Sequence, residues 1–135
     1  MTMYSVTKRI EFCYGHRLLD YDGVCKHPHG HNAIAEIEIR AAQLDSRNMV
    51  CDFSDIKRIV KGWIDKEFDH RMLLRHDDPL VTALQQLGEP VFICESNPTV
   101  EHIAQLIFRQ ANQQGLPVVR VKVWETPTSY AEYTE

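Results

Sequence analysis

Apolar residues alternate with polar ones near both ends of the chain, which is the spacing of half-buried strands. The alternation runs from Tyr4 to Phe12 and, more regularly, from Ala33 to Arg40. We therefore expect two long antiparallel strands there. Val119, Val121 and Val123 recur at strict period two and predict a third strand through Trp124, and the stretch 130–133 predicts a last one.

The middle of the chain has the spacing of amphipathic helices. Apolar positions at intervals of three and four predict a helix from Phe53 to about Phe68, with Asp52 or Ser54 as its N-cap. A shorter helix is predicted over 78–87, ending at Gly88, followed by a brief strand over 91–94. A further helix opens near Asn97-Pro98-Thr99 and ends at Gly115. Its expected buried stripe comprises Val100, Ile103, Ala104, Ile107, Phe108 and Ala111.

This order of elements predicts an α+β fold in which two helices cover the apolar face of an antiparallel sheet. No repeat, linker or low-complexity stretch divides the pattern, so residues 1–135 are expected to form a single domain. An open sheet keeps free edges and a second face. Assembly of several copies into a ring would close both, so we expect a homo-oligomer.

Composition narrows the class of protein. Apolar residues make up 44% and charged residues 25%, as in a globular protein, and no apolar run is long enough to span a membrane. A net charge of −4 argues against nucleic-acid binding and favours a small-molecule partner. The N-terminus lacks the pattern of a secretory signal, and the four cysteines are irregularly spaced. Both features indicate the cytoplasm.

Candidate metal ligands are concentrated between His16 and His31, a stretch with four of the seven histidines and one of the four cysteines. Residues two apart on a strand point to one face, so His29 and His31 can meet at one ion. Pairing with the preceding strand would bring His16 over the same face. Three neutral imidazoles suit zinc.

The role of Cys25 is left open by spacing alone. A structural zinc site usually has four protein ligands, which would include this thiol, whereas a catalytic site keeps one position free. The alternative to any metal site is a set of ordinary surface or core histidines, which the H-x-H pair beside a cysteine disfavours.

The sequence resembles the 6-pyruvoyl-tetrahydropterin synthase family over nearly its whole length, from Phe12 to Pro127. Within that family it is most similar to the bacterial 6-carboxy-tetrahydropterin synthase branch. The resemblance is carried by Phe12…His16-Arg17-Leu18, Cys25…His29-Gly30-His31-Asn32, Met49-Val50-Cys51-Asp52-Phe53, Asp69-His70, Asn97-Pro98-Thr99-Val100-Glu101 and Trp124-Glu125-Thr126-Pro127.

The resemblance implies the tunnelling fold, or T-fold, in which subunits associate into a barrel. The usual assembly is a dimer of trimers, that is, a hexamer, with active sites at subunit interfaces. It also implies that zinc is held by His16, His29 and His31. Cys25 then lies outside the metal's ligands as the catalytic thiol, with a thiolate that nearby zinc and imidazoles favour.

The same resemblance gives further residues a role. Asp69 orients His70, which exchanges protons with the substrate, although a bare Asp-His dipeptide is commonly a helix cap or a solvated charge. Glu125 is the pterin anchor, because one carboxylate can accept two parallel hydrogen bonds from the pterin edge. Thr99 and Glu101 assist from the start of their helix, unless Thr99 only caps it.

The implied reaction converts 7,8-dihydroneopterin triphosphate to 6-carboxy-5,6,7,8-tetrahydropterin, acetaldehyde and triphosphate, within queuosine biosynthesis. The three-residue gap between Cys25 and His29 favours this branch over 6-pyruvoyl-tetrahydropterin synthesis, in which the gap is longer. A rival of another class is a noncatalytic zinc-stabilised interaction module, which would use Cys25 as a fourth ligand and unfold on chelation.

Some positions depart from the family pattern. His27 and Pro28 stand where an arginine and a leucine are more familiar, and Leu74 and His102 stand where asparagine is common. Cys13 is also unusual. The basic residues nearest the motifs, as candidates for the triphosphate, are Arg17, Lys26, Lys57 and Arg71.

Overall fold

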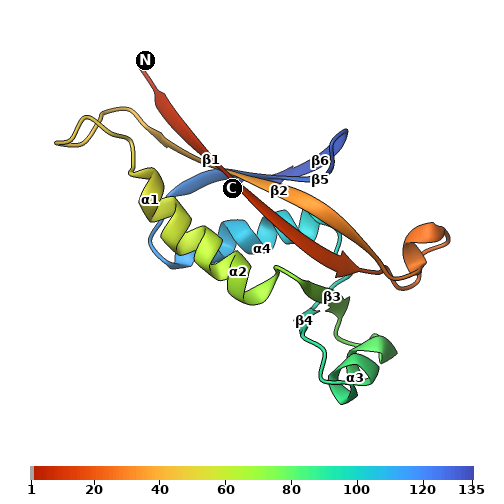
Figure 1. The fold of residues 1–135 in the computed structure, drawn as a ribbon. Helices are drawn as coiled ribbons and strands as arrows, with labels where there is room; N and C mark the ends of the chain where they lie inside the picture. Colours follow the sequence, from red (N-terminus) through yellow and green to blue (C-terminus); the bar gives the residue numbers. More distant parts are fainter. Residues whose placement is uncertain (1) are drawn as a thin grey trace.

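One mixed sheet organises the chain. The structure is a computed structural model that describes residues 2–135, and within them the strand order is β4-β3-β1-β2-β5-β6 (Figure 1). β1 (Tyr4–His16) and β2 (His29–Ala41) pair antiparallel along their whole length, from Tyr4 opposite Ala41 to His16 opposite His29. Both predicted strands are confirmed, and both extend further toward their connection than the alternation indicated.

The remaining strands extend the sheet on both sides. β5 (Val118–Thr126) pairs antiparallel with β2, and β6 (Ser129–Tyr133) pairs antiparallel with β5. On the other side, β3 (Arg71–Arg75) runs parallel to β1, and β4 (Val91–Cys94) runs parallel to β3. The α+β prediction is confirmed; β3 is a strand that the sequence pattern did not predict.

A continuous helical stretch follows the loop after β2, as predicted. It comprises α1 (Phe53–Ile56), the π-helical segment η2 (Lys57–Lys61) and α2 (Gly62–Glu67). Of the two candidate caps, Asp52 is the N-cap, because its carboxylate accepts a hydrogen bond from Ser54 N at 2.8 Å.

The two other helices also lie where they were expected. α3 (Pro79–Gln86) begins after the N-cap Asp78, and α4 (Val100–Gln113) begins after the N-cap Thr99. Gly115 follows α4 with φ of 86°, a conformation that glycine adopts without a steric penalty. The stripe of α4 is confirmed, since five of its residues are buried: Ile103, Ala104, Ile107, Phe108 and Ala111.

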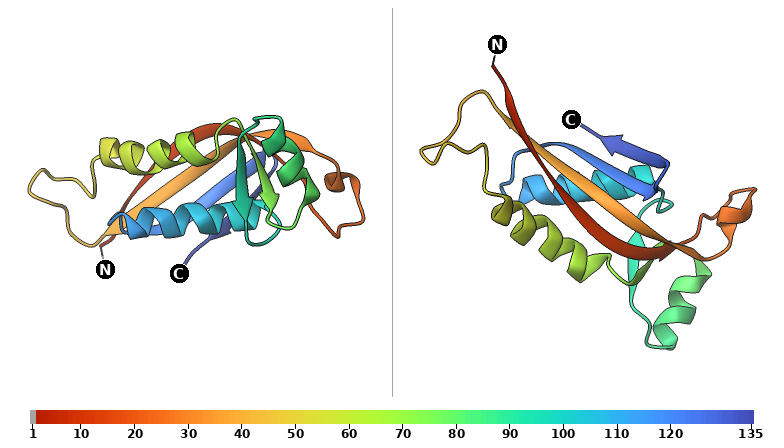
Figure 2. Two further views of the ribbon diagram at one scale, coloured as in Figure 1. Left: turned by 90° about the horizontal axis from the view of Figure 1, so that it is seen from below. Right: turned by 45° about the horizontal axis from the view of Figure 1, so that its top comes forward.

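The core lies between the sheet and two long helical elements. α1–α2 and α4 lie side by side across one face of the sheet, whereas no helix of residues 2–135 lies over the opposite face (Figure 2). Ile37, Val121, Ile64 and Ile103 are fully buried between these layers. On this face every second residue of a strand is buried. Residues that continue this alternation toward a strand's end therefore point to the same side of the sheet as the core residues.

The fold leaves all four cysteines unpaired. Cys94 is the buried one, and burial raises its pKa to about 12. Among residues 2–135 no helix combines the length and the apolar character needed to cross a membrane.

Candidate functional site

Three histidines lie at the connected ends of β1 and β2, on the face of the sheet that also carries the core residues. His16 lies opposite His29, and Tyr14 lies opposite His31, in the antiparallel register. Further along the same strands Phe12 pairs with Ala33, and both are buried in the core. The alternation that builds the core therefore also places the imidazoles on one face where the apolar part ends.

The ligand atoms of His16, His29 and His31 all lie within 4.8 Å of one another. His16 Nε2 and His31 Nε2 are 3.2 Å apart. Two nitrogen ligands of a tetrahedral ion, each about 2.0–2.1 Å from the metal, are about 3.3 Å apart, so the observed spacing fits a shared ion closely. The predicted convergence of the three histidines is confirmed as a possible metal site.

Backbone carbonyls fix the orientation of two of these rings. His16 Nδ1 lies 2.7 Å from the carbonyl oxygen of Pro98, and His29 Nδ1 lies 2.7 Å from that of His27. A carbonyl oxygen only accepts, so each Nδ1 carries the proton and donates it. Nε2 is left with the free lone pair, which is the tautomer that binds a metal through Nε2.

Burial also favours the neutral rings that a metal requires. Desolvation lowers the pKa of His16 and that of His31 below the ordinary value, and the neighbouring His29 acts in the same direction. Hydrogen bonding to Pro98 and the charge of Glu125 oppose this shift at His16 without reversing it. The donor set therefore fits a divalent ion such as zinc.

Glu125 on β5 lies against the histidine group. Its Oε1 is 3.4 Å from His31 Nε2, 3.6 Å from His16 Nε2 and 3.5 Å from the hydroxyl of Tyr14. Burial and this carboxylate together raise the pKa of Tyr14, which therefore stays a neutral donor. The structure thus adds a negative charge beside the three imidazoles; the pterin-anchor role of Glu125 stays a prediction.

Cys25 lies on the loop between β1 and β2, in a single turn of 3-10 helix, η1 (Val24–Lys26). Its side chain is half-buried, and its carbonyl oxygen accepts a hydrogen bond from Leu18 N at 2.9 Å. Among the described residues the group of converging ligand atoms contains the three histidines without this thiol. Cys25 as a catalytic thiol stays a prediction.

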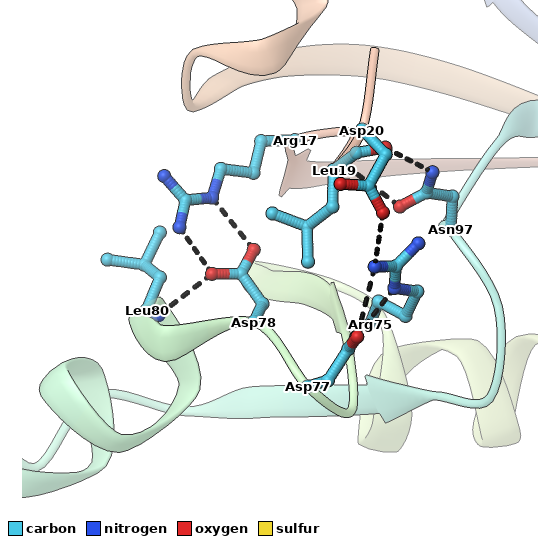
Figure 3. Close-up of polar contacts among 8 residues, drawn as sticks. All are labelled: Arg17, Leu19, Asp20, Arg75, Asp77, Asp78, Leu80 and Asn97. Atoms are coloured by element: carbon cyan, nitrogen blue, oxygen red, sulfur yellow. Dashed lines mark hydrogen bonds and ion pairs between the residues drawn. The ribbon is translucent and has the colours of Figure 1, made fainter.

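Side-chain contacts fasten this loop to distant parts of the chain (Figure 3). Leu19 N donates to Asn97 Oδ1 at 3.0 Å, and Asn97 Nδ2 donates back to Leu19 O at 2.8 Å. Arg75 on β3 donates to Asp20 and to Asp77. The loop that carries Cys25 is therefore held against β3 and against the segment before α4.

The most deeply buried of the ion pairs at this loop joins Arg17 to Asp78. Arg17 Nε donates to Asp78 Oδ2 at 2.7 Å, a second bond joins Nη2 to Oδ1, and Leu80 N donates to Oδ1 at 2.8 Å (Figure 3). The Asp78 side chain is fully buried. Arg17 was a candidate for the triphosphate; its guanidinium is instead committed to this carboxylate.

Asp78→Asn is expected to lower the free energy of unfolding by about 3 kcal/mol at pH 7, because it leaves a largely buried Arg17 without its charged partner. The Arg17 hydrogen bonds hold the Asp78 pKa below its ordinary value. The contribution is therefore present above the unfolded pKa of about 3.9 and is lost as pH falls through the folded pKa. Urea unfolding at pH 7 measures the loss of stability in the variant, and urea unfolding in acid tests whether the difference from the wild type disappears there.

The matched control is Asp77→Asn. Asp77 also pairs with an arginine, but its side chain is half exposed, so the expected loss is below about 1 kcal/mol. Equal losses in the two variants would show that the buried pair has no special weight.

Asp69 and His70 lie between α2 and β3. Asp69 Oδ2 is 2.8 Å from His70 Nδ1, and Asp69 Oδ1 accepts a hydrogen bond from Cys13 N at 2.9 Å. Burial raises the Asp69 pKa, but these two hydrogen bonds outweigh it and lower the pKa overall. The carboxylate thus orients an imidazole whose side chain is 79% exposed, and the proton-exchanging role of His70 stays a prediction.

His70 adopts an unusual backbone conformation, with φ of 60°. For a residue other than glycine this left-handed conformation costs roughly 1–2 kcal/mol. The cost is offset by the bond from His70 N to Cys13 O, at 2.7 Å. The Asp69 backbone N donates to Ile64 O of α2 at 2.9 Å and so helps to end that helix, whereas both partners of its carboxylate, Cys13 and His70, lie outside α2.

One open hollow of about 620 Å³ is bordered by residues of both groups. His29, from the histidine group, and His70 both line it, together with Cys13 and Arg71. Arg71, another candidate for the triphosphate, is thus the basic residue placed beside them. The sequence patterns did not predict the hydrogen bonds that Cys13, Asn97 and the Pro98 carbonyl make at the site, because each bond joins segments that are far apart in the chain.

The start of α4 also lies near the site. Thr99 Oγ1 accepts a hydrogen bond from His102 N at 3.2 Å, so the capping role is observed. Glu101 is exposed in the first turn, where a carboxylate is favoured by the helix dipole. Substrate contacts of Thr99 and Glu101 stay predictions.

Comparison with known proteins finds similar sequences over nearly the whole length of this chain. The sequence profile described as 6-pyruvoyl tetrahydropterin synthase matches residues 5–135. The 6-carboxy-5,6,7,8-tetrahydropterin synthase of Rickettsia bellii is 35% identical over 137 residues, which cover 96% of this chain and 99% of that protein. The protein of the same name from Haemophilus influenzae is 35% identical over 141 residues, covering 98% and 100%.

Solved structures share the fold. An uncharacterized protein from Wolinella succinogenes superposes with a TM-score of 0.85 at 25% identity, covering 100% of this chain and 99% of that one. The 6-pyruvoyl tetrahydropterin synthase of Caenorhabditis elegans superposes with a TM-score of 0.74 at 20% identity, covering 100% and 97%. These similarities confirm the predicted T-fold.

Proposed function

The chain belongs to the 6-pyruvoyl tetrahydropterin synthase family, and on that premise we propose that it is a zinc-dependent 6-carboxy-5,6,7,8-tetrahydropterin synthase. Its reaction would convert 7,8-dihydroneopterin triphosphate to 6-carboxy-5,6,7,8-tetrahydropterin, acetaldehyde and triphosphate. The observation that carries the proposal is the convergence of three imidazoles, two of them with Nδ1 held by a backbone carbonyl so that Nε2 is free, beside the hollow that His70 also lines.

The reaction requires protons to move on carbons that bear hydroxyl groups. A zinc ion held by His16, His29 and His31 would supply Lewis acidity toward the oxygens of the substrate side chain. Cys25, as thiolate, is the base that takes a carbon-bound proton, since its loop begins directly after one histidine of the group and ends before the next. His70, oriented by Asp69, exchanges protons with the substrate.

Glu125 accounts for recognition of the pterin ring. Its carboxylate can accept two parallel N–H hydrogen bonds from the amidine-like edge of the pterin, with Thr99 and Glu101 assisting from the start of α4. Because Glu125 lies 3.4 Å from His31, a pterin held by it has its side chain close to the metal-binding face. Arg71 is the basic residue that we assign to the triphosphate.

Glu125→Gln is expected to weaken binding of neopterin by about 10- to 100-fold, because the amide replaces one charged acceptor with a donor that faces the pterin N–H groups. Isothermal titration calorimetry measures the affinity, and zinc content is checked in the same preparation. Glu11→Gln, at an exposed position on β1, is the control. Unchanged affinity in the Glu125 variant would remove the anchor role.

The uncovered sheet face supports assembly. β4 and β6 are the two edges of the sheet, and the face opposite α1–α2 and α4 has no helix over it. Closure of several copies into a barrel, as a hexamer, would pair those edges. Sedimentation equilibrium tests this, and a monomeric mass would end it. The four free thiols fit a cytoplasmic enzyme, and we place it in queuosine biosynthesis.

The decisive experiment identifies the products. Zinc-loaded protein is incubated with 7,8-dihydroneopterin triphosphate, and the mixture is analysed by mass spectrometry with a trap for small aldehydes. Acetaldehyde with 6-carboxy-tetrahydropterin is expected. Formation of 6-pyruvoyl-tetrahydropterin would assign the chain to the other synthase, and absence of turnover with zinc bound would favour a noncatalytic zinc module.

A further inference from the structure

Cys13 lies beside the Asp69–His70 pair, and it has no role in the proposed reaction. Two hydrogen bonds of the Cys13 backbone join them: Cys13 N donates to the Asp69 side-chain atom Oδ1 at 2.9 Å, and His70 N donates to Cys13 O at 2.7 Å. A sulfur atom, a carboxylate oxygen and an imidazole nitrogen of these three residues lie within 4.8 Å of one another. β1 and the α2–β3 connection thus bring three potential ligand atoms together.

This cluster is distinct from the histidine group. Side chains alternate along β1, so Cys13 faces the side opposite to Tyr14 and His16. Burial agrees, since Tyr14 and His16 are each 2% exposed whereas Cys13 is half-buried. An ion at Cys13 would therefore not displace one held by His16, His29 and His31.

The donor chemistry selects the kind of ion. Thiolate, imidazole and carboxylate together suit zinc and other thiophilic divalent metals, and they disfavour magnesium or calcium, which prefer oxygen ligands. Ligands of such an ion at 2.0–2.3 Å lie roughly 3.3–3.8 Å apart. The three ligand atoms lie within 4.8 Å of one another, and Asp69 Oδ2 and His70 Nδ1 are 2.8 Å apart, so small side-chain adjustments that give up this hydrogen bond would form the site. Two negative ligands would balance the charge of a divalent cation.

Access from solvent is also present. Cys13 and His70 both line the open hollow of about 620 Å³, and the His70 side chain is 79% exposed. Arg71 and Glu89 also line the hollow and carry opposite charges. A three-ligand site on an open wall leaves a fourth position for water.

We propose that Cys13, Asp69 and His70 form a second metal site for a thiophilic divalent cation, and that its occupancy inhibits the enzyme. Binding forms a metal–sulfur bond and releases the thiol proton of Cys13 to solvent. A His70 nitrogen that carries an ion cannot take up a proton at that atom. The inhibition rests on the proposed function, whereas the binding does not.

Cobalt(II) is the probe that separates the two sites. Zinc-free protein is titrated with cobalt chloride and followed by absorption spectroscopy. The three-histidine site contributes only visible ligand-field bands, whereas a thiolate ligand adds a strong sulfur-to-cobalt charge-transfer band in the near ultraviolet. We expect that band in the wild type and in Cys25→Ser, and its loss in Cys13→Ser and in His70→Ala.

Two results would overturn the site. One is the absence of the charge-transfer band in the wild type at saturating cobalt, and the other is its loss in Cys25→Ser with retention in Cys13→Ser, which would make Cys25 the thiol ligand. Retention of the visible bands in Cys13→Ser shows that this variant has folded. None of these readings requires turnover, so they stand whether or not the proposed reaction is found.

Inhibition is tested separately, with zinc chloride added beyond one equivalent. The zinc concentration that halves turnover should rise by at least about 10-fold in Cys13→Ser, each variant being compared with its own activity at one equivalent. An equal zinc response in the two proteins would refute the inhibitory role.

Discussion

Replacing His31 by Ala should release the bound zinc and lower turnover of 7,8-dihydroneopterin triphosphate by about 10³-fold. His31 Nε2 lies 3.2 Å from His16 Nε2, so the variant removes one of two nitrogen atoms that are already at the spacing of metal ligands. Lewis acidity supplies several kcal/mol to such a step, and each 1.36 kcal/mol corresponds to a factor of ten. Metal analysis and a turnover assay measure the two effects.

His27→Ala is the matched control for this variant. It removes a histidine from the same stretch of chain, exposed and outside the converging group. It keeps the backbone carbonyl that accepts the His29 Nδ1 proton. Retained zinc with full turnover is expected. If His27→Ala lost zinc as fully as His31→Ala, the assignment of the ligands would be wrong.

Cys25→Ser should reduce kcat by about 10²- to 10⁴-fold while zinc stays bound. This range is the usual contribution of a positioned acid or base, and a serine hydroxyl is a far weaker base than a thiolate at neutral pH. The three histidines converge without this thiol, which is why zinc should be retained. Steady-state kinetics and metal analysis of one preparation give both values.

The control for this thiol is Cys51→Ser. Cys51 is also half-buried, and burial together with Asp55 and Asp52 raises its pKa, so it is an inert thiol of similar exposure. Kinetics close to those of the wild type are expected. Loss of zinc together with activity in Cys25→Ser would favour a fourth-ligand role instead, as in the interaction-module alternative.

Strand alternation accounts for most of what the sequence could predict. Period two in the first two strands, continued to their ends, determines that His16, His29 and His31 share a face. β3 escaped prediction because Met72-Leu73-Leu74 is a short apolar run without alternation, and its two leucines are both buried. A strand buried on both faces has no periodic signal.

The supporting contacts of the site could not be predicted for a different reason. Arg17 and Asp78 are 61 positions apart, Leu19 and Asn97 are 78 apart, and Cys13 and Asp69 are 56 apart. No local pattern relates residues at such separations; only the completed sheet and helices bring them together. For the same reason no sequence pattern indicated that Arg17 binds Asp78 and is therefore not free to bind an anion.

The loop that carries Cys25 should be among the first parts of the protein to open on warming. The loop is attached by side-chain bonds from Asn97, Asp78 and Arg75, and it has no strand partner of its own between His16 and His29. Segments held in this way open locally at a lower free energy than a core of packed strands and helices. Amide hydrogen exchange at Leu19 should therefore be faster than in the middle of β2, and activity should fade on warming before the sheet unfolds.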